Sequence, residues 1–274
     1  MDNDTPPAPP YIIEAVELES QLPDDGLIIV DVGAPETYRN AHVPGAVHLD
    51  YAALTLGRPP APGLLPPPQQ LETALRTIGL SAGKRVVAYD DQGNGRASRL
   101  LWTLEAVGHA GLSLLNGGLP AWVGAGCATE QAPNRAAPGD FTVQINSSVV
   151  ADQDQVLASL DDARVMLLDA RTADEYNGLK SPSLRSGRIP GAVHLNWLDT
   201  IDRGNHLRFK PAAVLETMLA QRGLSRDKEI ITYCQTHHRS SHSFVMLRHL
   251  GFDKIRGYPG SWSQWGNDPR LPIE

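Results

Sequence analysis

Residues 42–50 read His-Val-Pro-Gly-Ala-Val-His-Leu-Asp, and residues 188–196 repeat them almost unchanged as Arg-Ile-Pro-Gly-Ala-Val-His-Leu-Asn. The flanking segments match in the same order: residues 29–32 with 167–170, residues 86–90 with 230–234, and residues 117–122 with 260–265. The spacing between the two copies is far longer than the roughly 20–50 residues of solenoid repeats. The sequence therefore predicts two tandem copies of one globular domain.

The length of the chain agrees with two domains, because 274 residues correspond to two units of about 100–200 residues. We place the first domain at residues 11–126 and the second at residues 141–274. Residues 127–140 are rich in Pro, Ala and Gly and lack helical or strand periodicity, which is typical of a linker. Residues 1–10 contain four Pro and no apolar run, which predicts a flexible tail and no secretory signal.

Short apolar runs alternate with helical patterns in both halves. The expected strands are residues 27–32, 46–49, 85–89, 112–115, 165–170, 192–195, 229–233 and 254–256. The expected helices are residues 68–78, 96–107, 211–222 and 240–250, each followed by a glycine that favours a helix end. Apolar strands joined by helices indicate a parallel sheet with helices on both faces and ligands at the carboxyl ends of the strands. The predicted fold class is α/β.

Composition excludes several functions. A net charge of −7 disfavours nucleic-acid binding, and no apolar run is long enough to span a membrane. Cys127 and Cys234 lie in different halves and form neither a disulfide framework nor a redox pair, which favours a reducing, cytoplasmic location. The histidines lack a metal-ligand spacing, so we expect no metal. Cys127 has no repeat counterpart to Cys234, and we assign it no role.

Cys234 follows the apolar segment 230–233 and precedes a helical pattern. The loop that joins them is Gln235, Thr236, His237, His238 and Arg239. Backbone N–H groups at a helix N-terminus and neighbouring cations lower a cysteine pKa from about 8.5 to roughly 3.5–7.5. The pattern therefore predicts a nucleophilic thiolate at Cys234. The counterpart in the first copy is Asp90, which cannot carry sulfur, and its loop lacks the cluster of His and Arg.

Together these motifs resemble a tandem-domain rhodanese, a member of a sulfurtransferase family. The resemblance rests on the paired Pro-Gly-Ala motifs, the Asp-X-Arg-X4-Tyr run around Arg171, the loop at Cys234, and Gly-Ser-Trp-Ser-Gln-Trp at residues 260–265. The Cys-Gln-Thr-His-His-Arg loop is similar to a bacterial subset. The resemblance implies an inactive first domain, a second domain whose cysteine forms a persulfide, an active site facing the interdomain cleft, and no metal or organic cofactor.

The resemblance also implies thiosulfate as the sulfur donor and cyanide, a thiol or another protein as the acceptor. We expect Cys234 to be catalytic, the N–H groups of residues 235–239 to hold the persulfide, and Arg239 to reinforce that field. Arg171 is the candidate for the sulfonate of the donor, with an ordinary ion pair as the other interpretation. Only one of His237 and His238 should face the pocket. Trp197 and Trp262 are candidates for lining the cleft or for the core.

Several alternatives remain at this point. Animal thiosulfate sulfurtransferases carry a basic residue two positions after the cysteine, where this chain has Thr236. Relatives that use mercaptopyruvate carry a Cys-Gly-Ser-Gly loop, which this chain also lacks. The sulfur donor could therefore be 3-mercaptopyruvate or another compound instead of thiosulfate. A rhodanese-fold phosphatase would use Cys-X5-Arg, whereas this loop has Cys-X4-Arg and is one residue too short for phosphate. A sulfur-relay protein and a binding module without catalysis are the remaining hypotheses.

Overall fold

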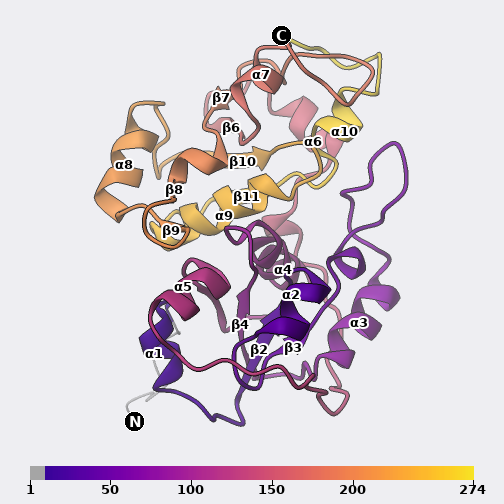
Figure 1. The fold of residues 1–274 in the computed structure, drawn as a ribbon. Helices are drawn as coiled ribbons and strands as arrows, with labels where there is room; N and C mark the ends of the chain where they lie inside the picture. Colours follow the sequence, from indigo (N-terminus) through magenta and orange to yellow (C-terminus); the bar gives the residue numbers. More distant parts are fainter. Residues whose placement is uncertain (1–9) are drawn as a thin grey trace, which may run out of the picture.

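The computed structural model describes residues 10–274, so the expected tail at residues 1–10 lies almost wholly outside the described residues. Two α/β domains lie one above the other in Figure 1, with the indigo-to-magenta first domain below the orange-to-yellow second domain. Each is built on a parallel sheet, and the predicted α/β fold class with two tandem domains is confirmed.

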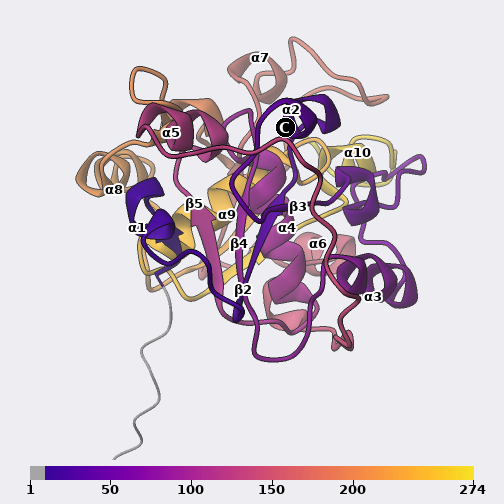
Figure 2. The ribbon, with the colours of Figure 1, turned by 60° about the horizontal axis from the view of Figure 1, so that its bottom comes forward.

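The first domain has the strand order β1-β5-β4-β2-β3, all parallel where paired. Its strands are β1 (Ile12–Ile13), β2 (Leu27–Asp31), β3 (Val47–His48), β4 (Arg85–Tyr89) and β5 (Leu112–Leu115). Its helices are α1 (Ala15–Glu19), α2 (Pro35–Asn40), α3 (Pro68–Thr77), α4 (Gly95–Ala106) and α5 (Gly118–Gly124), with a 3-10 turn at Tyr51–Leu54. Figure 2 shows β2, β4 and β5 side by side, with helices around them.

The second domain repeats this plan with the strand order β11-β10-β6-β7. Its strands are β6 (Val165–Asp169), β7 (Val193–His194), β10 (Glu229–Tyr233) and β11 (Ile255–Gly257), with a separate hairpin of β8 (Ile201–Asp202) and β9 (Arg208–Phe209). Its helices are α6 (Gln153–Ala158), α7 (Ala173–Tyr176), α8 (Ala212–Ala220), α9 (Arg239–His249) and α10 (Ser261–Trp265). Two 3-10 turns at Ser147–Val149 and Trp197–Thr200 complete it.

The predicted strands and helices lie within about two residues of those observed. The sequence patterns did not predict β1, the β8–β9 hairpin or the short helices α1, α2, α5, α6, α7 and α10, because elements of so few residues are too short to show a periodic pattern. Residues 127–140 contain no helix or strand and only an isolated bridge of Glu130 to His42, and the predicted domain boundaries remain predictions.

The two domains share one hydrophobic core. Helix α4 of the first domain packs against α9 of the second (Figure 1). Leu100 and Leu104 of α4 belong to the same buried cluster as Phe244 and Leu247 of α9. Because each of these helices follows the carboxyl end of a central strand, their packing brings the ends of β4 and β10 toward the same interface.

Candidate active site

Cys234 lies one residue beyond β10, and its main chain is fixed from both sides. Its N–H donates to the Ser261 hydroxyl at 3.2 Å, and its carbonyl oxygen accepts from Trp262 N at 2.9 Å. Residue 237 has a φ of +59°, a left-handed conformation that folds the loop back before α9 begins. The Cys234 side chain is fully buried. The loop therefore holds the sulfur in one position at the start of a helix.

The surroundings of Cys234 favour the thiolate. Burial by itself raises the pKa of the thiol. The positive charge of Arg239, the Ser240 hydroxyl and the N–H groups of Ser240 and Thr236 lower it, and they outweigh the burial. The net pKa lies below the ordinary value. This is the combination of helix N-terminus, cation and hydrogen-bond donors that activates a cysteine.

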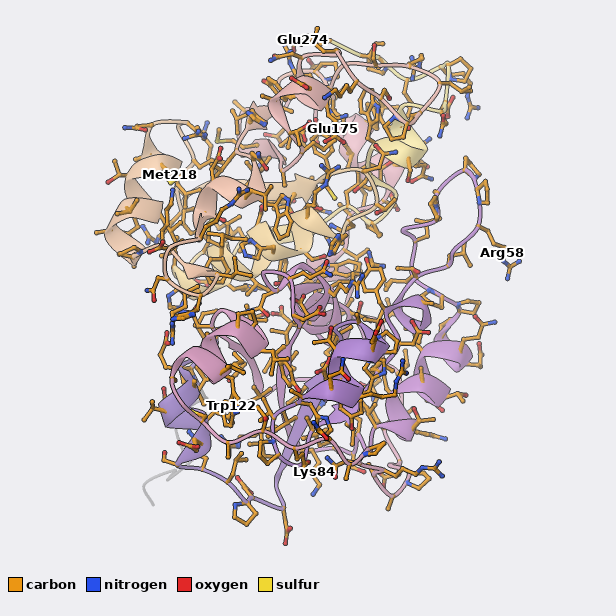
Figure 3. The ribbon with its side chains drawn as sticks, in the orientation of Figure 1. Arg58, Lys84, Trp122, Glu175, Met218 and Glu274 are labelled. Carbon is orange, nitrogen blue, oxygen red and sulfur yellow. The ribbon has the colours of Figure 1, made fainter. Side chains whose placement is uncertain are left out.

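Arg239 is held by a carboxylate that sequence reasoning did not identify. Its two Nη atoms donate to Glu175, at 2.6 Å and 2.7 Å. Glu175, labelled in Figure 3, lies in the second domain. It belongs to α7, where it also closes a capping box with Thr172. Arg239 therefore lies beside the sulfur in a fixed orientation, with much of its charge compensated.

The two histidines of the loop contact the first domain. His237 is buried, bonded through Nδ1 to Ser240 Oγ at 2.7 Å and packed edge-on against Trp102. His238 is half-buried between Tyr51 and Trp197. Burial, together with nearby arginines, lowers the pKa of His238 to about 4 and that of His237 well below its usual value. Both rings are neutral near pH 7, so the loop is less cationic than its sequence indicates.

Arg171 lies in a buried ion pair. Its Nε and Nη2 donate to the Asp169 carboxylate at 2.6–3.0 Å, and Nη2 also donates to Gly187 O. The guanidinium stacks on Trp262, 4.6 Å from the ring centroid. Only Nη1 has no partner within residues 10–274. The structure thus holds Arg171 against Trp262 of α10 and in the ion pair with Asp169, with Nη1 as the guanidinium nitrogen left unpaired.

The remaining predicted residues have mainly structural contacts. Gln235 donates from Nε2 to Ser183 Oγ at 3.1 Å, and its carbonyl oxygen accepts from Ser263 N. The N–H of Thr236 is directed to Cys234, and its carbonyl faces the first domain. Trp262 is fully buried and belongs to the core, whereas Trp197 lies against His238 and His242.

The first domain contributes side chains that sequence reasoning missed. Tyr51 packs against His238 with ring centroids 5.5 Å apart, and Arg99 of α4 donates to the carbonyls of Thr236 and His237 in the loop. Burial and the charge of Arg96, also in α4, lower the pKa of His238. A sequence signal was present. The repeat makes the helix after Asp90 the counterpart of the helix after Cys234, and two arginines lie among its first five residues.

Asp90 fills the corresponding loop of the first domain with its own carboxylate. Its Oδ1 accepts from the N–H groups of Gln92 and Asn94, and Oδ2 accepts from those of Arg96 and Ala97, at 2.7–3.1 Å. The first domain therefore keeps an anion-binding loop, and its anion is a side chain that cannot leave.

Within residues 10–274, His, Cys, Asp and Glu side chains form no cluster of three or more suited to a metal ion. No helix in the described part of the chain has the length and apolar character to cross a membrane.

Comparison with known proteins gives consistent results. A family model described as "Rhodanese-like domain" matches residues 14–125 and 152–268. A thiosulfate sulfurtransferase of Azotobacter vinelandii is 37% identical over 265 residues, covering 97% of both chains. One of Pseudomonas aeruginosa is 37% identical over 97% of both chains, and a 3-mercaptopyruvate sulfurtransferase of Escherichia coli is 31% identical over 89% of this chain and 87% of its own.

Solved structures show the same fold. The anaerobic ergothioneine biosynthesis enzyme from Chlorobium limicola, in complex with trimethyl histidine, superimposes with a TM-score of 0.85 at 23% identity. The match covers 96% of this chain and 70% of that one.

Proposed function

The chain belongs to the rhodanese family, and from that premise we propose that it is a thiosulfate sulfurtransferase in which Cys234 carries the transferred sulfur. The observation that carries the proposal is the buried Cys234 thiol, whose pKa is lowered, in spite of burial, by Arg239, the Ser240 hydroxyl and main-chain N–H groups at the start of α9. Relatives at 37% identity over nearly the whole chain, named thiosulfate sulfurtransferase, support thiosulfate as the donor.

In the first step, the Cys234 thiolate attacks the outer sulfur of thiosulfate. An S–S bond forms to Cys234 while the S–S bond of thiosulfate breaks, and sulfite leaves with the electron pair. The product is a persulfide whose terminal sulfur is anionic. Main-chain N–H groups and Arg239 stabilise this charge without transferring a proton.

In the second step, an acceptor attacks the terminal sulfur, and the Cys234 thiolate is regenerated as the leaving group. Cyanide gives thiocyanate, and a thiolate gives a new persulfide on the acceptor. A protein thiol fits the same step. Because Cys234 is fully buried, donor and acceptor need a local displacement of the side chains around the loop.

The other predicted residues take supporting roles in this proposal. Gln235 and Thr236 shape the loop, and His237 and His238 join it to the first domain. Arg171 remains a candidate for the donor sulfonate through its unpaired Nη1, although its pairing with Asp169 favours a structural role. The compensated charge of Arg239 gives no support to a phosphatase, which needs a free arginine to enclose phosphate.

A cytoplasmic location is part of the proposal. It is supported by two cysteines that are both free, one of which must remain reduced to react.

Intact mass tests the function directly. We expect brief exposure to thiosulfate to add about one sulfur atom to the chain and cyanide to remove it. Cys234→Ser should abolish the gain, and Cys127→Ser is the matched control that should retain it. A gain from 3-mercaptopyruvate and none from thiosulfate would overturn the choice of donor. No gain from either would overturn the sulfurtransferase assignment and favour a binding role.

A further inference from the structure

Arg99 is a fully buried cation, and every hydrogen bond that it donates within residues 10–274 goes to a main-chain carbonyl. In its own domain, Nη2 donates to Gly63 O at 2.7 Å and to Leu54 O at 3.0 Å. Across the interface, Nη1 lies 3.4 Å from Thr236 O and 3.5 Å from His237 O, both in the loop that follows Cys234. One side chain of the first domain therefore joins a first-domain segment to the catalytic loop.

The charge of Arg99 lacks a carboxylate partner. Among the ion pairs within residues 10–274, none includes Arg99. Buried charges in proteins are generally paired, because an unpaired one is costly. Burial lowers the pKa of Arg99, and Tyr51 and Cys234 are the groups that act against this effect. Burial raises the pKa of Tyr51, so its phenol is neutral near pH 7. Cys234, whose thiol pKa is lowered, is the neighbouring group on which negative charge develops.

Peptide geometry shows which part of the loop these contacts hold. In a trans peptide, the C=O and the following N–H point in opposite directions. Because the carbonyls of Thr236 and His237 face Arg99, the N–H groups of residues 237 and 238 point away from it. The N–H groups directed to the Cys234 sulfur are those of Thr236 and Ser240, on either side of the two peptides that Arg99 contacts. The Ser241 hydroxyl also donates to His237 O and fixes the same peptide.

Gly63 gives an independent sign that this contact is close. A Cβ at residue 63 would lie 2.3 Å from Thr236 O and 2.7 Å from Pro259 O, which leaves no room for one. The first-domain segment thus rests directly on the main chain of the loop. Gly63 O is also the nearest acceptor of Arg99.

We propose that Arg99 is a positioning residue for the sulfur chemistry, holding the catalytic loop from its outer side and supplying positive charge to the anion on Cys234. The first domain then completes the site of the second, although its own loop carries Asp90 in place of a cysteine. This proposal rests on the proposed function only in taking Cys234 as the reacting group.

The test is a titration of the thiolate by its ultraviolet absorbance, in a Cys127→Ser background so that one thiol reports. We expect Arg99→Met to raise the pKa of Cys234 by a few tenths of a unit to about one unit and Arg99→Lys to restore part of the change. The rate constant for persulfide formation near pH 7 should fall in parallel. The titration contains no sulfur donor, so an error in the choice of thiosulfate leaves this result unaffected.

Arg222→Met is the matched control. Arg222 is a half-buried arginine that also donates to carbonyls, those of His194 and Met218, away from the loop. We expect this variant to leave the thiolate pKa unchanged. The proposal is wrong if Arg99→Met lowers the unfolding temperature while the thiolate pKa and the reaction rate stay those of the parent.

Gly63→Ala provides a second route if Arg99→Met does not fold. The added methyl displaces the segment that rests on Thr236 and separates Gly63 O from Arg99. The same rise in thiolate pKa is expected. A folded Gly63→Ala protein with an unchanged thiolate pKa overturns the proposal.

Discussion

Arg239 and Glu175 form a two-point ion pair, with Nη1 donating to Oε2 at 2.6 Å and Nη2 donating to Oε1 at 2.7 Å. The pair aligns the guanidinium beside the Cys234 sulfur and also reduces its net charge. Glu175 therefore sets how strongly Arg239 attracts an anion, a property that the loop sequence alone does not reveal.

Glu175→Gln isolates this charge, because glutamine can keep the capping box with Thr172. Without the negative charge of Glu175, Arg239 should attract thiosulfate more strongly. We expect the KM for thiosulfate to fall by roughly two- to fivefold, which corresponds to about 1 kcal/mol or less of additional binding free energy. The free energy of unfolding should fall by about 1–3 kcal/mol. Steady-state kinetics and urea unfolding measure both. Glu216→Gln, which removes an exposed pair with Arg226, is the control, and an unchanged KM in Glu175→Gln would contradict the prediction.

Acid stability should also depend on Glu175. Burial raises its pKa, but Arg239 and Thr172 outweigh this and lower it from 4.5 to about 2. Since the folded-state pKa is depressed, the group stabilises the fold above pH 4.5 and loses this contribution as the pH falls toward 2. Unfolding free energies measured between pH 6 and pH 2 should therefore decline less steeply in Glu175→Gln than in the parent. Equal slopes would count against the ion pair as a source of acid sensitivity.

The repeated motif predicted the fold because its residues perform the same structural task twice. Tyr89 OH accepts from Val43 N, and Tyr233 OH accepts from Ile189 N in the second copy. Gly45 and Gly191 have φ of +77° and +73°, a left-handed turn that glycine adopts without strain. Local requirements of this kind are visible in a sequence.

The Cys234 loop could also be predicted, since strand, thiol and helix follow one another directly. The partners of that loop could not. Glu175 and Arg99 reach it from distant parts of the chain, and the charge state of His238 depends on burial by the first domain. The sequence shows which charged side chains the loop contains. Which of these charges are neutralised by a partner or by burial depends on how the two domains pack.

Asp90 should be necessary for the fold of the first domain. Its two oxygens accept four main-chain N–H groups in a buried loop. Asp90→Asn would place an amide donor against two of these N–H groups, and we expect a loss of roughly 2–4 kcal/mol in the free energy of unfolding. Calorimetry of the variant tests this, with exposed Asp25→Asn as the control. A loss below about 0.5 kcal/mol would show that the loop holds its shape without the carboxylate.

Arg96 is the candidate for the first contact with an anionic donor. It lies in the first turn of α4, half-buried, and within residues 10–274 its guanidinium is part of no ion pair. It is near enough to His238 to help lower the pKa of that ring. Unlike Arg239, it therefore presents an uncompensated charge beside the catalytic loop.

Arg96→Ala should raise the KM for thiosulfate about fivefold, equivalent to about 1 kcal/mol, and leave kcat nearly unchanged. The difference from the parent should shrink as salt screens the charge. Arg58→Ala is the control, because Arg58 projects into solvent from a first-domain loop (Figure 3). A fall in kcat with an unchanged KM would instead place Arg96 at the reacting sulfur. An unaltered KM at low salt would remove it from the path of the donor.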